Sequence, residues 1–139
     1  MIMTMADAHG FRIGCRTEGA QHAEVKLAVP TTNSFLVRLP FKTKLIADKA
    51  YDSDPLRDEL SQLDIDLVVP HRRGRKKPKR QDGRTLRRYK NRWKVERLFA
   101  WLNNFRKTVV RGEYHLENFE AFIQLAFDVI LLRYLLDTL

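Results

Sequence analysis

LRRYKNRWKVERLFAWLNNFR, residues 86–106, is the stretch around which the rest of the chain is organised. It contains no Gly or Pro, and its apolar residues recur at near-helical spacing, which predicts one amphipathic helix over about 86–106. A second stripe of this helix, in steps of three and four, is formed by Tyr89, Arg92, Glu96, Phe99, Asn103 and Arg106. On the helix alone, the simplest interpretation is a solvated face on which Glu96 balances Arg92.

Two buried strands separated by a helix are predicted upstream of this stretch. Residues 45–47 form a short apolar run that ends on Asp48, and residues 65–69 form another. Residues 53–55 are Ser-Asp-Pro, which is a helix-start signal. This order predicts a parallel pair of strands joined by a crossover helix, and therefore the α/β class.

The N-terminal part reads as a hairpin followed by a helix. Residues 2–6 are apolar and close on Asp7, and residues 11–17 alternate in polarity, so we expect two strands joined by a turn. Residues 21–29 fit a short helix that Pro30 stops. Residues 34–39 fit a strand or a helix, and that choice stays open.

Length and composition limit the number of domains, the kind of binding partner and the cellular compartment. The 139 residues suit one domain, residues 1–139, and the net charge of +9 makes nucleic acid the default partner. The single cysteine excludes an intrachain disulfide and fits a reducing cytoplasm. Residues 116–136 predict an apolar helix that buries against a sheet or a partner subunit. Within it, Gln124, Asp128 and Arg133 interrupt the apolar stretch 119–136, which argues against a membrane span.

Residues 71–84, HRRGRKKPKRQDGR, form a basic segment that we expect to be a mobile loop, because like charges repel and Gly and Pro break its periodicity. Thirteen of the chain's 26 Lys and Arg residues lie between Arg72 and Lys94. That concentration favours phosphate contact over a solvated tail, although phosphate contact carries no sequence specificity. Nearby, we interpret Asp54 as a helix cap and Asp52 as a turn residue.

Three carboxylates stand out by position. Asp7 and Asp48 each end a predicted strand, and Glu96 lies on the long helix. Ligand sites in open α/β sheets form beyond the carboxyl ends of strands, so a helix across that edge would bring the three together. Three hard oxygen donors suit Mg²⁺ or Mn²⁺ rather than zinc.

Two further segments carry a resemblance to a family. ADKAYDSD at 47–54 and YKNRWKVERLFAWLNNFRK at 89–107 resemble the DDE transposases of bacterial insertion sequences. Their third-carboxylate helix is marked by Tyr, two residues, Arg, three residues, Glu, six residues and Lys.

Tyr89, Arg92 and Glu96 match that spacing, whereas the Lys position falls on Asn103, for which Arg106, one turn on, is expected to substitute. The segment at 6–27 resembles the first-Asp segment of the family more loosely. There, His22 matches a family position, and a structural role fits it equally well.

The resemblance implies a ribonuclease-H-like α/β fold: a mixed sheet flanked by helices, with a long C-terminal helical pair. The sequence does not show where the third strand of such a sheet lies. The resemblance also implies Asp7, Asp48 and Glu96 as catalytic ligands of two Mg²⁺ (or Mn²⁺) ions. The side chains expected to contact DNA are Arg72, Arg73, Arg75, Lys76, Lys77, Lys79, Arg80, Tyr89, Arg92 and Arg106.

The implied function is a transposase that cleaves DNA and transfers strands by two-metal phosphoryl transfer. The resemblance further implies a homodimer on DNA, in the bacterial cytoplasm and associated with the nucleoid. Because such transposases usually carry an N-terminal DNA-end-binding region, we expect this chain to be the catalytic part, truncated at its N-terminus. The alternatives are a catalytically dead remnant that acts as a basic DNA-binding module and, more weakly, a membrane-surface or structural protein.

Overall fold

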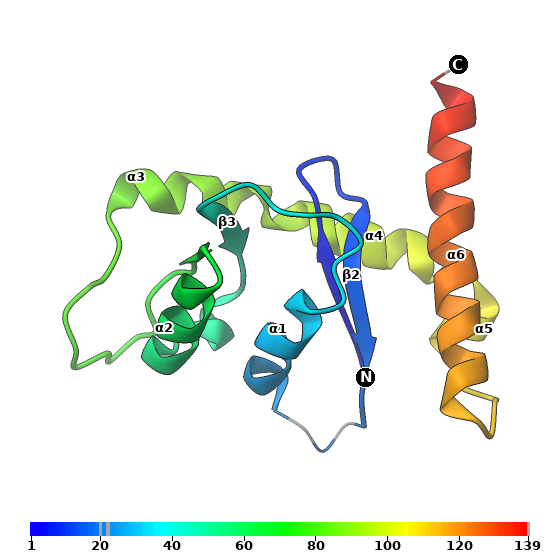
Figure 1. Cartoon of the computed structure of the whole chain (residues 1–139), viewed down its shortest axis with the longest axis horizontal. Helices are drawn as coiled ribbons and strands as arrows, with labels where there is room; N and C mark the ends of the chain where they lie inside the picture. The colour runs from blue at the N-terminus through cyan, green and yellow to red at the C-terminus, as the bar shows by residue number, and fades with distance from the viewer. Residues whose placement is uncertain (20, 22, 139) are drawn as a thin grey trace. The chain divides into compact units, whose positions relative to one another are not determined.

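The computed structural model describes residues 1–19, 21 and 23–138, and it mixes helices with strands, which confirms the α/β class. The expectation for His22 lies outside the described residues. The elements, in chain order, are β1 (Ile2–Ala6), β2 (Arg12–Thr17), α1 (Glu24–Thr32), β3 (Thr43–Ile46), η1 (Lys49–Tyr51), α2 (Asp54–Gln62), β4 (Ile65–Val68), α3 (Gly83–Leu86), η2 (Arg87–Arg92), α4 (Trp93–Leu102), α5 (Arg106–Val109) and α6 (Leu116–Asp137) (Figure 1).

The chain forms two compact units. Unit 1 contains Met1–Met5 and Ile13–Trp93, and unit 2 contains Ala6–Arg12 and Lys94–Leu139. The assignment of 1–139 to a single catalytic domain stays a prediction.

The N-terminal hairpin forms as predicted, with β1 and β2 in a two-stranded sheet. At the open end, the Met1 ammonium donates to the Glu18 carbonyl at 2.7 Å, and the Glu18 N–H donates back to the Met1 carbonyl at 3.0 Å. At the turn, the Asp7 N–H donates to the Phe11 carbonyl at 2.8 Å. Gly10 has φ +89°, a backbone conformation that glycine adopts without steric cost, and it therefore permits the tight turn.

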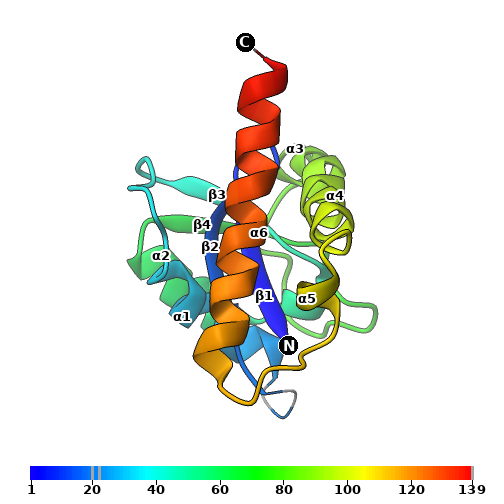
Figure 2. The same ribbon diagram turned by 90° about the vertical axis from the view of Figure 1, so that its right-hand side faces the viewer.

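β3 and β4 confirm the predicted parallel pair. Thr43 lies opposite Ile65 and Ile46 opposite Val68, and α2 connects the two strands and packs on β4 (Figure 2). The buried core of unit 1 joins these strands to α1 and α2, and consists of Ala28, Leu56, Leu60, Ile65, Leu67 and Val69.

The single mixed sheet that we expected does not form among the described residues, whose strands make two separate two-stranded sheets. Residues 33–42 contain turns and bends, so neither option for 34–39 was correct. The preceding helix α1 runs through Pro30 to Thr32 instead of stopping before the proline. The Thr31 and Thr32 hydroxyls donate to carbonyls one turn back, those of Leu27 at 2.7 Å and Val29 at 2.6 Å.

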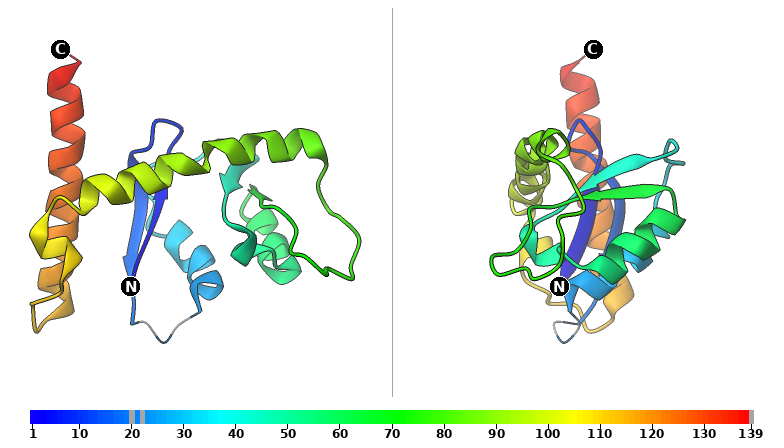
Figure 3. Two further views of the ribbon diagram at one scale, coloured as in Figure 1. Left: turned by 180° about the vertical axis from the view of Figure 1, so that it is seen from behind. Right: turned by 90° about the vertical axis from the view of Figure 1, so that its left-hand side faces the viewer.

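The helix predicted over 86–106 is divided into four pieces. It begins earlier, at Gly83, where the Asp82 carboxylate accepts from the Thr85 N–H at 2.8 Å and caps α3. α3 passes directly into the 3₁₀ segment η2 (Figure 3). After Leu102 the chain turns and restarts as α5, and the Leu102 carbonyl at the helix end accepts from the Phe105 N–H at 3.0 Å and from the buried Thr108 hydroxyl at 2.8 Å.

α6 confirms the predicted C-terminal helix. One of its faces is buried within the chain and another is exposed, so burial of the second face against a partner subunit stays a prediction. Within unit 2 it packs against α5. None of the described helices combines the length and apolarity that a membrane crossing needs.

Candidate active site

Asp48 is the second residue after β3, and it contacts both 3₁₀ segments, η1 and η2. Its Oδ1 accepts from the Lys49 N–H at 2.6 Å, which caps η1, and from the Tyr89 hydroxyl at 3.4 Å. The Arg92 guanidinium lies 3.9 Å from Oδ2. That separation is beyond hydrogen-bond range, and the Asp48 side chain is 44% exposed, so this oxygen remains accessible to a ligand.

The 3₁₀ geometry explains how Tyr89 and Arg92 both reach Asp48. With three residues per turn, side chains three apart eclipse each other. The Arg92 guanidinium accordingly lies 5.8 Å from the centroid of the Tyr89 ring. The structure therefore gives both residues a contact with the predicted catalytic carboxylate, which fits the expectation that they hold the active-site geometry.

Asp7 shapes the turn between β1 and β2. Its Oδ1 accepts from the N–H groups of His9 at 2.8 Å and Phe11 at 2.9 Å, and His9 Nδ1 lies 3.5 Å from Oδ2. One carboxylate oxygen is thus committed to the turn, while the other faces a largely exposed imidazole.

The first turns of α4 hold the Asp7 turn within unit 2. The Lys94 ammonium donates to the Ala8 carbonyl, and the Arg97 guanidinium donates to the His9 carbonyl. A Cβ on Gly10 would lie 2.7 Å from Arg97 Nη2, so a larger residue there would displace the Arg97 guanidinium. Glu96 lies between the two cations in the sequence, in the first turn of α4, where the helix dipole favours a carboxylate.

The three predicted metal ligands are thus distributed over both units. Asp7 and Glu96 belong to unit 2, and Asp48 belongs to unit 1 with Tyr89 and Arg92. Among the described residues, no three His, Cys, Asp or Glu side chains form a group that could hold a metal ion. The donor set itself consists of hard carboxylate oxygens, which is the chemistry that Mg²⁺ and Mn²⁺ prefer.

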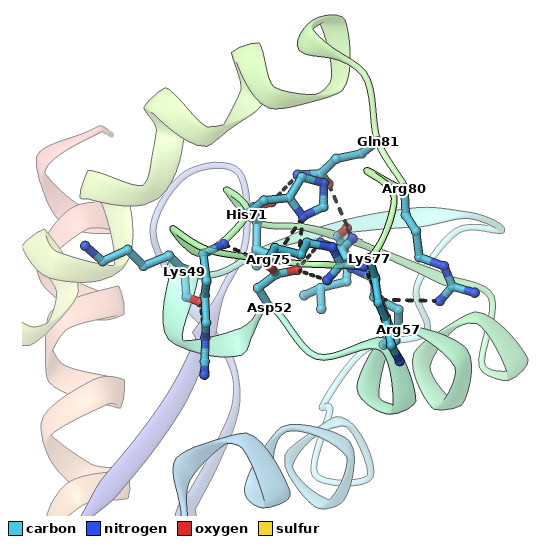
Figure 4. Close-up of polar contacts among 12 residues, drawn as sticks. Lys49, Asp52, Arg57, His71, Arg75, Lys77, Arg80 and Gln81 are labelled. Atoms are coloured by element: carbon cyan, nitrogen blue, oxygen red, sulfur yellow. Dashed lines mark hydrogen bonds and ion pairs between the residues drawn. The ribbon is translucent and has the colours of Figure 1, made fainter.

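The basic segment, residues 71–84, has no regular structure before α3 and is anchored by a buried carboxylate, and its mobility stays a prediction (Figure 3). The Asp52 side chain is 1% exposed and accepts from Arg57, His71 Nδ1 and Arg75, each at 3.2 Å. It also accepts from the Arg72 N–H at 3.0 Å. Figure 4 shows these donors converging on Asp52.

These contacts control the ionisation of Asp52. Burial acts to raise the pKa of this carboxyl group. The hydrogen bonds from the Arg72 N–H, Arg57 and His71 outweigh burial and hold the pKa below its ordinary value. Asp52 therefore stays charged as the partner of the cations that surround it, and it is an anchor rather than a turn residue.

A second carboxylate, Asp54, extends this anchor. Arg75 donates to Asp54 Oδ1 at 2.6 Å, and Lys77 lies 3.5 Å from Oδ2. The hydrogen bond from Arg75 lowers the pKa of Asp54. Arg80 donates to Asp58 at 2.8 Å. Asp54 opens α2 without the side-chain cap that we expected, because its carboxylate binds the basic segment instead.

The anchor connects the basic segment to the Asp48 site. The Arg72 guanidinium donates to the Lys49 carbonyl at 3.2 Å and to the Ala50 carbonyl, in the residues that directly follow Asp48. Several of the predicted DNA-binding cations therefore have structural contacts. Within the basic segment, Arg73, Lys76 and Lys79 are exposed predicted contacts with neither an ion pair nor a side-chain hydrogen bond among the described residues, whereas exposed Arg72 is held by backbone carbonyls.

Sequence reasoning missed the residues of this anchor. Arg57 lies on α2 and is 9% exposed, where its guanidinium also donates to the Leu67 carbonyl at 2.8 Å. Gln81 donates to the Val69 carbonyl and so secures the far end of the segment. The available signal was charge complementarity, because Asp52, Asp54 and Asp58 precede a strongly basic stretch.

Arg106 does not continue the stripe of Glu96. α4 ends at Leu102, and Asn103 lies in the following turn, so Arg106 is the first residue of a separate helix, α5. Its expected substitution for the missing Lys was argued from a continuous helix, which the structure does not contain. A DNA contact by Arg106 stays a prediction.

Comparison with known proteins assigns the family. A family model described as "Transposase DDE domain" matches residues 1–128. The chain is 37% identical over 79 residues to a Burkholderia cepacia protein named as a candidate transposase for insertion sequence element IS402. That match covers 57% of this chain and 34% of the relative, and no solved structure matches significantly. Since the family model spans nearly the whole chain, including Asp7, Asp48 and Glu96, the chain belongs to the DDE-domain transposases.

Proposed function

We propose that this chain forms the catalytic core of an insertion-sequence transposase, which cleaves DNA at the ends of its element and transfers them to target DNA. The observation that carries the proposal is Asp48. It is an accessible carboxylate at the end of a parallel strand, and it contacts Tyr89 and Arg92, the residues that precede Glu96 in the family spacing. Family membership supports the same chemistry.

Asp7, Asp48 and Glu96 are proposed to hold two Mg²⁺ or Mn²⁺ ions. When bound, such ions activate the attacking oxygen and stabilise the leaving oxygen of a phosphodiester. The chain's own contribution is positioning: Tyr89 and Lys49 fix one oxygen of Asp48, and the Asp7 turn is fastened to the helix that carries Glu96. A ribonuclease-H-like arrangement of the two sheets is part of this proposal.

The basic segment is proposed to bind the DNA backbone. Arg73, Lys76 and Lys79 offer exposed cations, and phosphate contacts position a duplex without reading its sequence. Arg72, Arg75, Lys77, Arg80, Tyr89, Arg92 and Arg106 are proposed to contribute to the same interface or to hold it in place. A homodimer on DNA and association with the nucleoid belong to the proposal.

A matched pair of variants tests the catalytic role of Asp48. Asp48→Asn keeps the shape of the side chain but removes its charge, and should abolish Mg²⁺-dependent strand transfer of DNA that carries the repeats flanking the gene. Asp66→Asn is the control, because Asp66 is also 44% exposed and pairs with one cation, Lys44, at 3.1 Å. Strand transfer by Asp48→Asn at the wild-type rate would refute the assignment.

The second candidate is a DNA-binding remnant without chemistry, favoured by Asn103 in place of the family Lys and by the end of α4 just before it. The two candidates differ in metal binding. A catalytic core should gain thermal stability on addition of Mn²⁺, because a ligand that binds the folded state stabilises it. The gain should vanish in Asp48→Asn and persist in Asp66→Asn, whereas a remnant should show no gain in any variant.

A further inference from the structure

α6 presents two apolar faces, and one of them is exposed. The buried face consists of Phe119, Ile123, Ala126, Phe127 and Ile130. On another side of the helix, Leu125 is 59% exposed, Leu132 56% and Leu136 68%. An apolar stripe of this kind on a folded chain marks an interaction surface.

The exposed face has the spacing of a coiled-coil seam. Its members, which we call the α6 seam, are Phe122, Leu125, Val129, Leu132 and Leu136; Val129 is half-buried and the other four are exposed. They are separated by three, four, three and four residues, which is the alternation of the a and d positions of a heptad. Phe122, Val129 and Leu136 occupy a, and Leu125 and Leu132 occupy d. The central a position is β-branched and both d positions are leucine, the combination that favours a two-stranded parallel coiled coil.

The charges beside the α6 seam select the same arrangement. In this register Asp128 occupies a g position, and Arg133 occupies the e position five residues later. In a parallel pair, g of one helix faces that e position of the other, so each Asp128 would meet the Arg133 of the second copy. An antiparallel pair would lose this match. A symmetric dimer forms the contact twice.

The contacts that these side chains make within one chain are compatible with pairing. Asp128 Oδ1 accepts from the Gln124 amide at 3.2 Å on the exposed side of the helix, and the Arg133 guanidinium lies 6.0 Å from the centroid of the Phe105 ring. The Lys107 ammonium lies 5.4 Å from the Phe122 ring at one end of the seam. None of these contacts covers Leu125, Leu132 or Leu136.

We propose that α6 of two copies of this chain associates through the α6 seam as a parallel, two-stranded coiled coil without DNA. This names the surface of the homodimer in the proposed function, but it rests on α6 and not on the catalytic assignment. Residues 122–136 span about 21 Å of helix at 1.5 Å per residue. Because a seam of two heptads is short, the dimer should be reversible and depend on concentration.

Two leucine variants of the full chain test the seam. Leu132→Gln places an amide at a d position, and Leu131→Gln makes the same change at the neighbouring c position. Leu131 and Leu132 are 42% and 56% exposed, so neither change should alter helix content measured by circular dichroism. In sedimentation experiments over a wide range of concentration, the wild type and Leu131→Gln should dimerise, and Leu132→Gln should bind itself at least tenfold more weakly.

Charge exchange tests the parallel direction. Asp128→Arg alone and Arg133→Asp alone should each weaken the dimer, because each places like charges together, and the double exchange should restore it. Asp137→Arg, at an outward b position of the same helix, is the control and should leave the dimer unchanged.

Three results would overturn the proposal. They are a wild type that stays monomeric at every concentration, equal weakening by Leu131→Gln and Leu132→Gln, and failure of the double exchange to restore a dimer that both single exchanges disrupt. A DNA-free dimer with no strand transfer would contradict the proposed function alone, and strand transfer by a chain that stays monomeric without DNA would contradict the coiled coil alone.

Discussion

Asp52 is one buried carboxylate that holds several of the chain's cationic side chains in place. Its buried carboxylate accepts hydrogen bonds from three side chains and one backbone N–H, and these donors fix the start of the basic segment. Removing one member of a buried ion pair is costly because its partners keep their charge without compensation. The surface pair between Asp48 and Arg92 is different, since solvent screens it and it adds little stability.

Asp52→Asn should therefore lower the free energy of unfolding by about 3 kcal/mol. The amide retains the shape of the side chain but leaves Arg57, which is 9% exposed, beside a neutral group. Urea unfolding monitored by circular dichroism measures the change. The exposed carboxylate Asp66 supplies the control, and Asp66→Asn should cost less than about 0.5 kcal/mol. Equal stability of the two variants would contradict the anchor.

The lowered pKa of Asp52 predicts a pH dependence. As the pH falls below the ordinary Asp pKa of about 3.9, the unfolded chain takes up the proton first, so the free energy of unfolding decreases. The stabilisation is fully present above that value and is lost as the pH falls through the pKa of the folded state. Asp54 contributes with the same sign, because its pKa is also lowered. Urea midpoints measured across this range should fall more steeply in the wild type than in Asp52→Asn, and parallel curves would contradict the assignment.

At the scale of elements, the sequence predicted correctly those helices and strands whose formation depends on neighbouring residues. The hairpin, the parallel strand pair and the C-terminal helix follow from turn residues, short apolar runs and a long apolar stretch. The break after Leu102 does not, because one of the contacts that accompany it comes from the hydroxyl of Thr108, six residues later. The passage of α1 through Pro30 was not predicted either, because a proline usually ends or kinks a helix.

Thr108→Val should destabilise unit 2 by about 1 kcal/mol, because the Leu102 carbonyl keeps the Phe105 N–H at 3.0 Å but loses its second, buried donor while the side-chain shape is kept. The Thr108 hydroxyl bonds the Leu102 and Phe105 carbonyls at 2.8 and 2.7 Å. Thr138 is the matched control, since its hydroxyl also bonds two carbonyls, at the exposed end of α6. Thr138→Val should change urea unfolding little, and a larger loss in Thr138→Val than in Thr108→Val would refute the explanation.

For the molecule as a whole, the sequence identified the candidate carboxylates and the basic character. It did not show which cations pair with carboxylates and which remain exposed for DNA. Net charge predicts attraction to a polyanion. It does not reveal that Arg75 and Arg80 bind Asp54 and Asp58, because that requires residues from two distant segments to meet in space. The role of Arg57 was hidden for the same reason, since its helix position alone indicates an ordinary surface residue.

The separation of the cations into paired and exposed groups predicts the salt dependence of DNA binding. Each cation that neutralises a phosphate releases counterions and contributes about 0.9 to the slope of log affinity against log salt. Replacing Arg73, Lys76 or Lys79 by Ala should therefore reduce the slope by about 0.9 in each single variant. Lys44→Ala is the control, because Lys44 pairs with Asp66 at 3.1 Å. Fluorescence anisotropy with a duplex over a salt series measures the slopes, and an unchanged slope in all three variants would exclude the segment from the interface.

The hydrogen bonds from the Arg72 guanidinium to the Lys49 and Ala50 carbonyls, which we call the clasp, predict how the protein behaves after limited proteolysis. Trypsin should first cut after the exposed cations Arg73, Lys76 and Lys79, all of which lie beyond the clasp in the chain. A nicked molecule would keep Arg72 on the same fragment as Asp48. Limited digestion should thus cut the chain between Asp48 and the helix that carries Glu96. The contacts between Arg72 and the loop after β3 should remain, because both lie on the N-terminal fragment.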